Sequence, residues 1–168
     1  MNYPRPVTPR ERDRLHAEVL SSSHDASFIS SDADLTDYLH EVAWDDQVNK
    51  TAITHLLFYD HILVGFFTLL NDSIKVNTIE DNDRIHGYVY RSLPAIKIGR
   101  LSVHRDHEKK GYGSEMLSLS LSYLFEVVKY SGCRIVTVDS KKGCEGFHSH
   151  FGFKMVKGRK DNYCPIWT

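Results

Sequence analysis

The chain has 168 residues, which is enough for one hydrophobic core, and we expect a single domain over residues 1–168. Its 21 Lys and Arg residues almost balance 22 Asp and Glu residues, which argues against nucleic-acid binding through bulk positive charge. No run reaches the ~20 apolar residues of a membrane span, and the first residues lack the apolar core of a secretory signal. The three cysteines are scattered, as in reduced proteins, so these features predict a cytoplasmic protein with no membrane partner.

The N-terminal half is predicted to contain two helices followed by a hairpin. Arg10 to Leu20 is expected to be helical, and Leu35 to Asp46 forms a second helix that Asp32 or Asp34 can cap. Two apolar runs, Thr51 to Tyr59 and Ile62 to Leu70, then read as strands that turn at Asp60 and His61. The mostly polar stretch from Ile74 to Tyr90 gives no clear assignment.

A central strand is predicted from Ala95 to Val103. Ile96 and Ile98 alternate with Lys97, but Leu101 and Val103 fall out of phase with them. One extra residue near Gly99 and Arg100 would return both pairs to one face, which predicts a β-bulge. The alternative is a strand buried on both faces, where the phase carries little information.

A charged loop and a long helix follow that strand. The loop ends in Glu108-Lys-Lys-Gly-Tyr-Gly113, and a glycine loop at a helix start presents free backbone N–H groups that bind phosphates. The helix carries an apolar stripe, and Gly132 is expected to end it as a C′ residue. The stripe residues are Met116, Leu117, Leu121, Leu124, Phe125, Val127 and Val128.

The C-terminal part is predicted to complete an α+β sheet. Arg134 to Asp139 is a buried strand, Cys144 to His150 a short helix, and strands follow near Phe153 to Val156 and Tyr163 to Trp167. None of the ten histidines forms a Cys/His set with ligand spacing, so no metal site is predicted.

Two blocks of the sequence resemble the GCN5-related N-acetyltransferases (GNAT). The strand, loop and helix from Leu101 to Glu115 are similar to motif A, with both loop glycines present and Glu108 in the place of the usual Gln or Arg. Phe147, His148, Phe151, Gly152 and Phe153 resemble the closing motif, with His148 in the place of the usual Tyr. Ile98 to Leu101, together with Phe28, Leu35, Tyr38 and Leu39, resembles the branch of acetyltransferase toxins that pair with small DNA-binding antitoxins.

The resemblance implies a fold, a co-substrate and a set of site residues. The fold would be a mixed, mostly antiparallel sheet flanked by helices, with two central strands splayed to admit acetyl-CoA. A backbone N–H near Val103 would stabilise the thioester oxygen, and His148 or a water would protonate the departing thiolate. Acetyl-CoA would be held by Leu101, Ser102, Val103, Glu108, Lys109, Lys110, Gly111, Tyr112, Gly113 and Ser114.

The sequence does not single out a general base. His104, Asp139, Asp72 and Glu80 are all candidates, and their order cannot be ranked. A site without a strong base suits an α-amine, whose pKa of about 7.7–8.0 leaves it partly neutral, better than a lysine with a pKa of about 10.4.

Three functions therefore compete. The first is an N-acetyltransferase for a primary amine of a small molecule or peptide. The second, implied by the toxin branch, is acetylation of the α-amine of aminoacyl-tRNA, with an antitoxin as partner. The third is a non-catalytic acyl-CoA-binding module. A homodimer is compatible with each of them.

Charge is distributed unevenly along the chain. Residues 1–60 carry five Lys and Arg against eleven Asp and Glu, a balance of −6, whereas residues 61–168 carry +5. The basic part is the one that would hold the anionic coenzyme. Ordinary solvated lysines, such as Lys154 and Lys157, explain part of this excess equally well.

Overall fold

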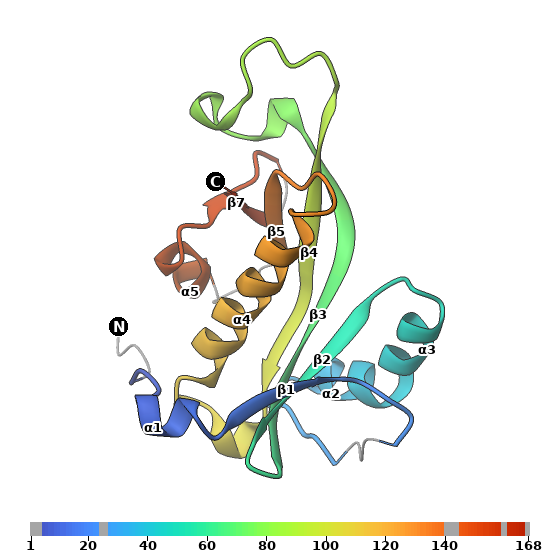
Figure 1. The fold of residues 1–168 in the computed structure, drawn as a ribbon, viewed down its shortest axis with the longest axis vertical. Helices are drawn as coiled ribbons and strands as arrows, with labels where there is room; N and C mark the ends of the chain where they lie inside the picture. Colours follow the sequence, from blue (N-terminus) through green and yellow to red (C-terminus); the bar gives the residue numbers. More distant parts are fainter. Residues whose placement is uncertain (1–4, 24–26, 140–144, 159–160, 167–168) are drawn as a thin grey trace. The chain divides into compact units, whose positions relative to one another are not determined.

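The computed structural model describes residues 5–23, 27–139, 145–158 and 161–166, and it divides the chain into two compact units (Figure 1). Unit 1 comprises residues 1–69 and 100–123, and unit 2 comprises residues 70–99 and 124–168. Three elements pass from one unit into the other: β3 (Ile62–Lys75), β4 (Ser92–Val103) and α4 (Tyr112–Val127). The expectation of one domain over the whole chain stays a prediction.

The strands form one seven-stranded sheet in the order β1-β2-β3-β4-β5-β7-β6. Strands β4 and β5 (Ile135–Asp139) are parallel, and the pairs β1–β2, β2–β3, β5–β7 and β6–β7 are antiparallel. The mixed, mostly antiparallel α+β sheet predicted from the sequence is therefore confirmed. The remaining strands are β1 (Leu15–Val19), β2 (Ile53–Tyr59), β6 (Lys154–Met155) and β7 (Asp161–Pro165).

The predicted helix from Arg10 to Leu20 is wrong. Only α1 (Pro9–Arg12) is helical; the Thr8 side chain accepts from the Glu11 N–H, and the Glu11 carboxylate accepts from the Thr8 N–H. The chain then becomes β1, which pairs along its whole length with β2. Leu15 and Ala17 are the half-buried positions of this strand, so period-2 alternation describes it better than a helical period.

The second predicted helix is confirmed, with an irregularity in its middle. It consists of α2 (Ala33–Asp37), the π-helical turn η1 (Tyr38–Val42) and α3 (Ala43–Val48), and Asp32 caps it by accepting from the Asp34 N–H at 3.0 Å. In Figure 1 this segment lies beside β2. One core of unit 1 forms there from Phe28, Tyr38, Leu39, Ala43, Leu56 and Phe66.

The hairpin of β2 and β3 turns at Asp60 and His61, as predicted. A bulge near Val64 shifts the register, so that Val64 and Phe67 both face α4. Gly65 lies directly under the helix, because a Cβ there would stand 2.8 Å from the Ser102 carbonyl oxygen and 2.7 Å from Met116 Cε. The second core of unit 1 contains Val7, Leu57, Val64, Phe67, Tyr112 and Met116.

Helix α4 buries part of the predicted stripe. Met116, Leu117 and Leu124 are almost fully buried, but Phe125 and Val127 are exposed, so the wider stripe is confirmed at Met116 and wrong at the other two positions. These two residues belong to the last turn of the helix. Gly132 does not have a positive φ, so the left-handed C′ cap predicted there is absent.

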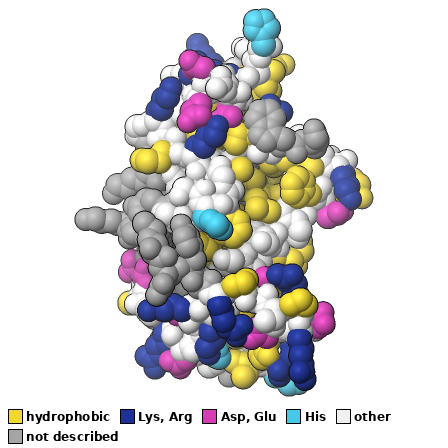
Figure 2. Space-filling view, turned by 90° about the vertical axis from the view of Figure 1, so that its left-hand side faces the viewer, with side chains coloured by type: hydrophobic (Ala, Val, Ile, Leu, Met, Phe, Trp, Pro, Cys, Tyr) yellow, Lys and Arg dark blue, Asp and Glu magenta, His cyan; other side chains and the backbone are white. Residues whose placement is uncertain are grey.

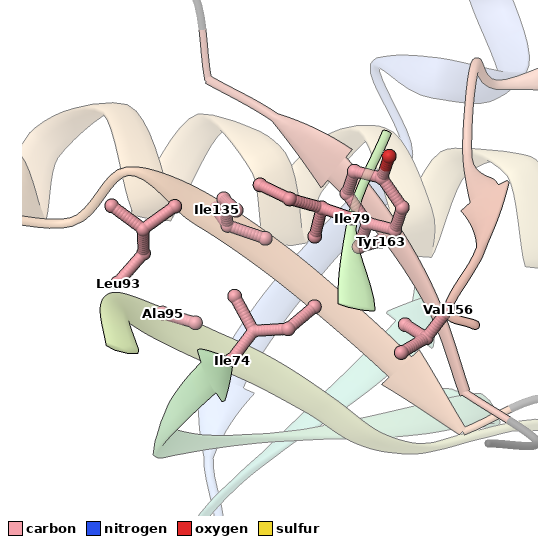
Figure 3. Packing of buried hydrophobic residues seen from close by; sticks show 7 residues of the cluster. All are labelled: Ile74, Ile79, Leu93, Ala95, Ile135, Val156 and Tyr163. Carbon is pink, nitrogen blue, oxygen red and sulfur yellow. The ribbon is translucent and has the colours of Figure 1, made fainter. Parts of the chain in front are cut away.

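Unit 2 has its own core, which includes Ile74 near the end of β3 and Leu93 and Ala95 near the start of β4. Figure 3 shows its seven side chains, which come from β3, β4, β5 and β7 and from the segments that follow β3 and β6. They are Ile74, Ile79, Leu93, Ala95, Ile135, Val156 and Tyr163. The polar stretch without a sequence assignment contains two short 3₁₀ turns, η2 (Val76–Thr78) and η3 (Asp81–Asp83).

A buried polar network fixes η3 to the C-terminal strands. The Tyr163 hydroxyl donates to Asp83 Oδ2 at 2.7 Å and accepts from the Glu80 N–H at 2.8 Å. Lys154 Nζ donates to the carboxylates of Asp83 and Glu80, both at 2.9 Å. Each buried polar group in this network therefore has a partner, as low-dielectric sites require.

No helix in the described part of the chain is long and apolar enough to span a membrane. Within the same residues, no group of three or more His, Cys, Asp or Glu side chains could hold a metal ion.

Candidate active site

The last residues of β4 offer two backbone donors on one edge of the strand. The N–H of Arg100 donates to Thr68 Oγ1 at 2.9 Å, and the N–H of His104 donates to the Val64 carbonyl at 2.8 Å, so both point toward β3. Because successive N–H groups alternate across a strand, those of Leu101 and Val103 point to the other edge. These are suitable donors for an oxygen that gains negative charge.

The ladder on that edge stops before these donors. Strand β4 pairs with β5 from Ala95 to Ile98, although β4 continues to Val103. The β-bulge that the sequence predicts near Gly99 and Arg100 stays a prediction, because the register of β4 against β5 ends at Ile98. The two N–H groups at Leu101 and Val103 thus lie beyond the parallel ladder.

The loop after β4 is held by its own basic residues. It contains the 3₁₀ turn η4 (Arg105–His107), and His104 Nδ1 accepts from the Asp106 N–H at 3.2 Å. Lys110 Nζ donates to the Asp106 carbonyl at 3.1 Å and to His107 Nδ1 at 3.3 Å. Burial and the nearby Lys110 charge lower the pKa of His107, so this acceptor stays neutral at physiological pH.

Helix α4 begins directly after this loop. The first intrahelical bond runs from the Glu115 N–H to the Gly111 carbonyl at 3.2 Å, so the earlier N–H groups have no intrahelical acceptor. Together with the helix dipole, these groups favour an anion at the helix start. In Figure 2, Lys and Arg side chains gather at the lower end of the molecule, where α1 and this loop lie in Figure 1.

Gly111 is required by both its conformation and its surroundings. Its φ is +89°, and a Cβ there would stand 2.6 Å from the Arg5 carbonyl oxygen. The N-terminal segment therefore crosses close to the loop, and Arg12 adds a bidentate ion pair to Glu115 of α4 with bonds of 2.9 and 2.6 Å. The sequence gives no signal for this contact, because its partners are about a hundred residues apart.

All ten residues predicted to hold the coenzyme lie in unit 1. Leu101, Ser102 and Val103 end β4, and Glu108, Lys109 and Lys110 form the exposed part of the loop. Gly111 and Tyr112 are buried, and Gly113 and Ser114 are half-buried in the first turn of α4.

His148 lies in unit 2, in the short helix α5 (Glu145–His150). Its side chain is only 6% exposed, and its ring centroid lies 6.0 Å from that of Phe153 and 5.4 Å from that of Phe147. The motif predicts that Phe147 and Phe151 lie in the core and that His148 points off the core face toward the cleft; the core placement of the two phenylalanines is wrong, because both are only half-buried. Its catalytic role stays a prediction.

Each of the four candidate bases makes a contact with another residue. Lys97 Nζ lies 2.9 Å from Asp139 and 3.7 Å from Asp72, and Lys154 pairs with Glu80. His104 uses Nδ1 as an acceptor, so a neutral ring carries its proton on Nε2 and can only donate there.

A family model for the acetyltransferase (GNAT) family matches residues 18–153, which is most of the chain. The chain belongs to this family. The acetyltransferase is also 25% identical over 130 residues to a tRNA-acetylating toxin of Mycobacterium tuberculosis, with 77% of each chain covered.

Solved structures of similar fold include two of the toxin AtaT. One is AtaT complexed with acetyl-methionyl-tRNAfMet, with a TM-score of 0.82, 17% identity and coverage of 90% of this acetyltransferase and 94% of AtaT. The other is an AtaT mutant bound to the C-terminus of the antitoxin AtaR and acetyl-CoA, with a TM-score of 0.75, 17% identity, and coverage of 91% and 94%. These likenesses confirm the fold predicted from the sequence.

Membership of the family makes the acetyltransferase an acyl-CoA-dependent N-acyltransferase with acetyl-CoA as its co-substrate. The α4 start has the donor set that a pyrophosphate needs, because it combines N–H groups without acceptors, a helix dipole and nearby lysines. The N–H groups of Leu101 and Val103 have the chemistry that a thioester carbonyl needs. The family's activity thus agrees with the two features that unit 1 presents.

Proposed function

We propose that this acetyltransferase moves the acetyl group of acetyl-CoA to the α-amine of an aminoacyl-tRNA. The observation that carries the proposal is that each candidate base already contacts another residue: Lys97 lies beside Asp139 and Asp72, Lys154 pairs with Glu80, and His104 Nδ1 accepts from the Asp106 N–H. A group whose atoms already hold other partners is poorly placed to take a proton from the acceptor, so the site favours an amine that is partly neutral without help. An α-amine meets this condition, and a lysine side chain does not.

The reaction then needs few groups. The neutral amine nitrogen attacks the thioester carbon, and the oxygen gains negative charge that the N–H groups of Leu101 and Val103 can stabilise. The C–S bond breaks as the amide forms. The nitrogen, which is positively charged after its attack, releases one proton to solvent, and the departing thiolate takes up one proton. We assign the thiolate's proton donor to His148, as the family resemblance implies.

The similarity to a tRNA-acetylating toxin of M. tuberculosis supports an α-amine carried by tRNA as the acceptor. The chain is close to neutral overall, so binding of an RNA backbone would depend on local basic residues and not on bulk charge. An aminoacyl-tRNA acceptor would place the reaction in the cytoplasm, and an antitoxin would be the expected protein partner. A peptide N-terminus is the second candidate, because it satisfies the same requirement for an α-amine.

The test is acetyl transfer from radiolabelled acetyl-CoA to a panel of acceptors. The panel should contain tRNAs charged with different amino acids, the same tRNAs without amino acid, peptides with free N-termini, and lysine-containing peptides with blocked N-termini. We expect label in charged tRNA only. Transfer to the peptide N-termini alone would replace the tRNA assignment, and transfer to the blocked peptides would contradict the argument from the absent base.

A further inference from the structure

Arg100 holds a positive charge beside the reactive edge of β4. Its Cζ atom lies 3.6 Å from the centroid of the Tyr38 ring, which is a close cation–π contact. The ring is itself fixed, because Tyr38 is 4% exposed and its hydroxyl donates to Asp46 at 3.0 Å. The N–H of Arg100 is anchored on Thr68 Oγ1, so both the backbone and the guanidinium plane have a defined place.

The guanidinium itself has no anionic partner within the described part of unit 1. Arg5, Arg12 and Arg14 each pair with a carboxylate, but Arg100 makes no ion pair or side-chain hydrogen bond with any described residue. Stacking uses the face of the guanidinium and leaves the N–H groups on its edges available. Asp46, the acid closest to the ring, already accepts from Tyr38 and from Thr51 Oγ1.

Arg100 lies on the same strand as the two N–H groups that we assign to the thioester oxygen. Arg100 and Ser102 share one face of β4, next to the segment that contains Ser30, since the Ser102 and Ser30 hydroxyls lie 2.9 Å apart. Val103 is three residues further, roughly 10 Å along the strand. That span is comparable to the distance from an α-amine across an aminoacyl ester and a ribose to the neighbouring phosphate.

We propose that Arg100, held over the Tyr38 ring, binds a phosphate group of the tRNA acceptor next to its aminoacylated end. A planar, forked donor pairs well with phosphate oxygens, and an arginine already stacked loses little freedom on binding. The site complements the α4 start, which is suited to the phosphates of the coenzyme. This inference rests on the proposed function, because a peptide acceptor carries no phosphate.

The test measures binding of deacylated tRNA, which needs no acetyl transfer. Full-length wild type, Arg100→Met and Arg10→Met are titrated with labelled tRNA at several salt concentrations. Arg10 is a matched control, because it is an exposed arginine of unit 1 for which the structure records no ion pair. We expect Arg100→Met to weaken binding about tenfold and to reduce the slope of log K against log salt by about 0.7–0.9, while Arg10→Met changes binding less than twofold.

Two further variants test the role of the ring. Tyr38→Phe keeps the ring and should bind tRNA as wild type does, whereas Tyr38→Leu removes it and should weaken binding. Arg100→Lys keeps the charge without the fork, so it should retain the salt slope and lose part of the affinity. Far-UV circular dichroism and melting temperature establish that each variant is folded before its binding is compared.

The outcomes separate this inference from the proposed function. If Arg100→Met binds tRNA with the affinity and salt slope of Arg10→Met, or if wild type does not bind tRNA, the phosphate site is refuted. If wild type binds tRNA through Arg100 but acetylates no charged tRNA, the proposed function fails and the site stands. With charged tRNA, Arg100→Met should raise KM about tenfold with kcat within twofold, and the reverse pattern would also overturn the assignment.

Discussion

Replacing Gly111 with alanine should destabilise the protein and weaken acetyl-CoA binding together. A non-glycine residue at φ +89° costs about 1–2 kcal/mol, and the added Cβ would stand 2.6 Å from the Arg5 carbonyl oxygen. Relieving such a contact with backbone costs about 1–3 kcal/mol more. We therefore expect a loss of about 2–5 kcal/mol, which for a chain of this size lowers the melting temperature by roughly 5–15 °C.

The effect on the coenzyme follows from the position of this residue. Gly111 precedes the first turn of α4, so a shift of its backbone re-aims the N–H groups that we assign to the pyrophosphate. Isothermal titration calorimetry should show acetyl-CoA binding roughly tenfold weaker in Gly111→Ala than in wild type. Differential scanning calorimetry on the same samples gives the change in melting temperature.

Gly87→Ala is the matched control. Gly87 has a φ of +72°, and a Cβ there would meet nothing within 4 Å, so its substitution carries the backbone strain without the contact. It should cost about 1 kcal/mol and leave acetyl-CoA affinity unchanged. If Gly111→Ala is no less stable than Gly87→Ala, the close approach of the N-terminal segment does not exist in solution and this reasoning fails.

Three further changes test other parts of the structure. Glu108→Gln should tighten acetyl-CoA binding several-fold at low salt, because it removes an exposed negative charge near the phosphates. The gain in affinity, measured by calorimetry, should be smaller in 0.5 M salt. Weaker binding would mean that Glu108 has another role. His148→Phe should lower kcat without changing acetyl-CoA affinity, and a wild-type rate at every pH would reject it as the acid. Burial and the bond to Asp83 raise the pKa of Tyr163 to about 12, so its protonated form stabilises the folded state below about pH 10 and this contribution is lost between pH 10 and 12. Tyr163→Phe should remove that alkaline loss in urea unfolding curves, and an unchanged pH dependence would assign it to another group.

The features predicted correctly from the sequence are those encoded locally. The hairpin at Asp60 and His61 and the strand–loop–helix from Leu101 to Ser114 follow from alternation, turn residues and glycines that act within a few positions. Asp32 caps the α2 segment as its residue type suggests. The strand, loop and helix start around Gly111 could therefore be predicted well.

The errors concern features that depend on tertiary contacts. Leu15, Ala17 and Val19 alternate with polar residues, but five residues are a short run, and pairing with β2 along the whole segment decides that it forms a strand. The motif places His148 between two phenylalanines, but packing against Phe153 buries the imidazole and leaves those rings half-buried. The Arg100–Tyr38 contact joins positions far apart in the chain, and no sequence pattern indicates it.

The π-helical turn from Tyr38 to Val42 can be regarded as a helix that has gained one residue. The wide turn takes up the extra residue, so the helix after it keeps the orientation that a regular helix would give. Gln47, which donates to the Leu20 carbonyl and accepts from the Thr54 N–H, and Ala43, which lies in the core, therefore hold the places that they would hold without the extra residue. A relative that lacks one residue here would keep these contacts, so a gap at this point in an alignment would mark a change in the turn that carries Tyr38 and no change in the helix beyond it.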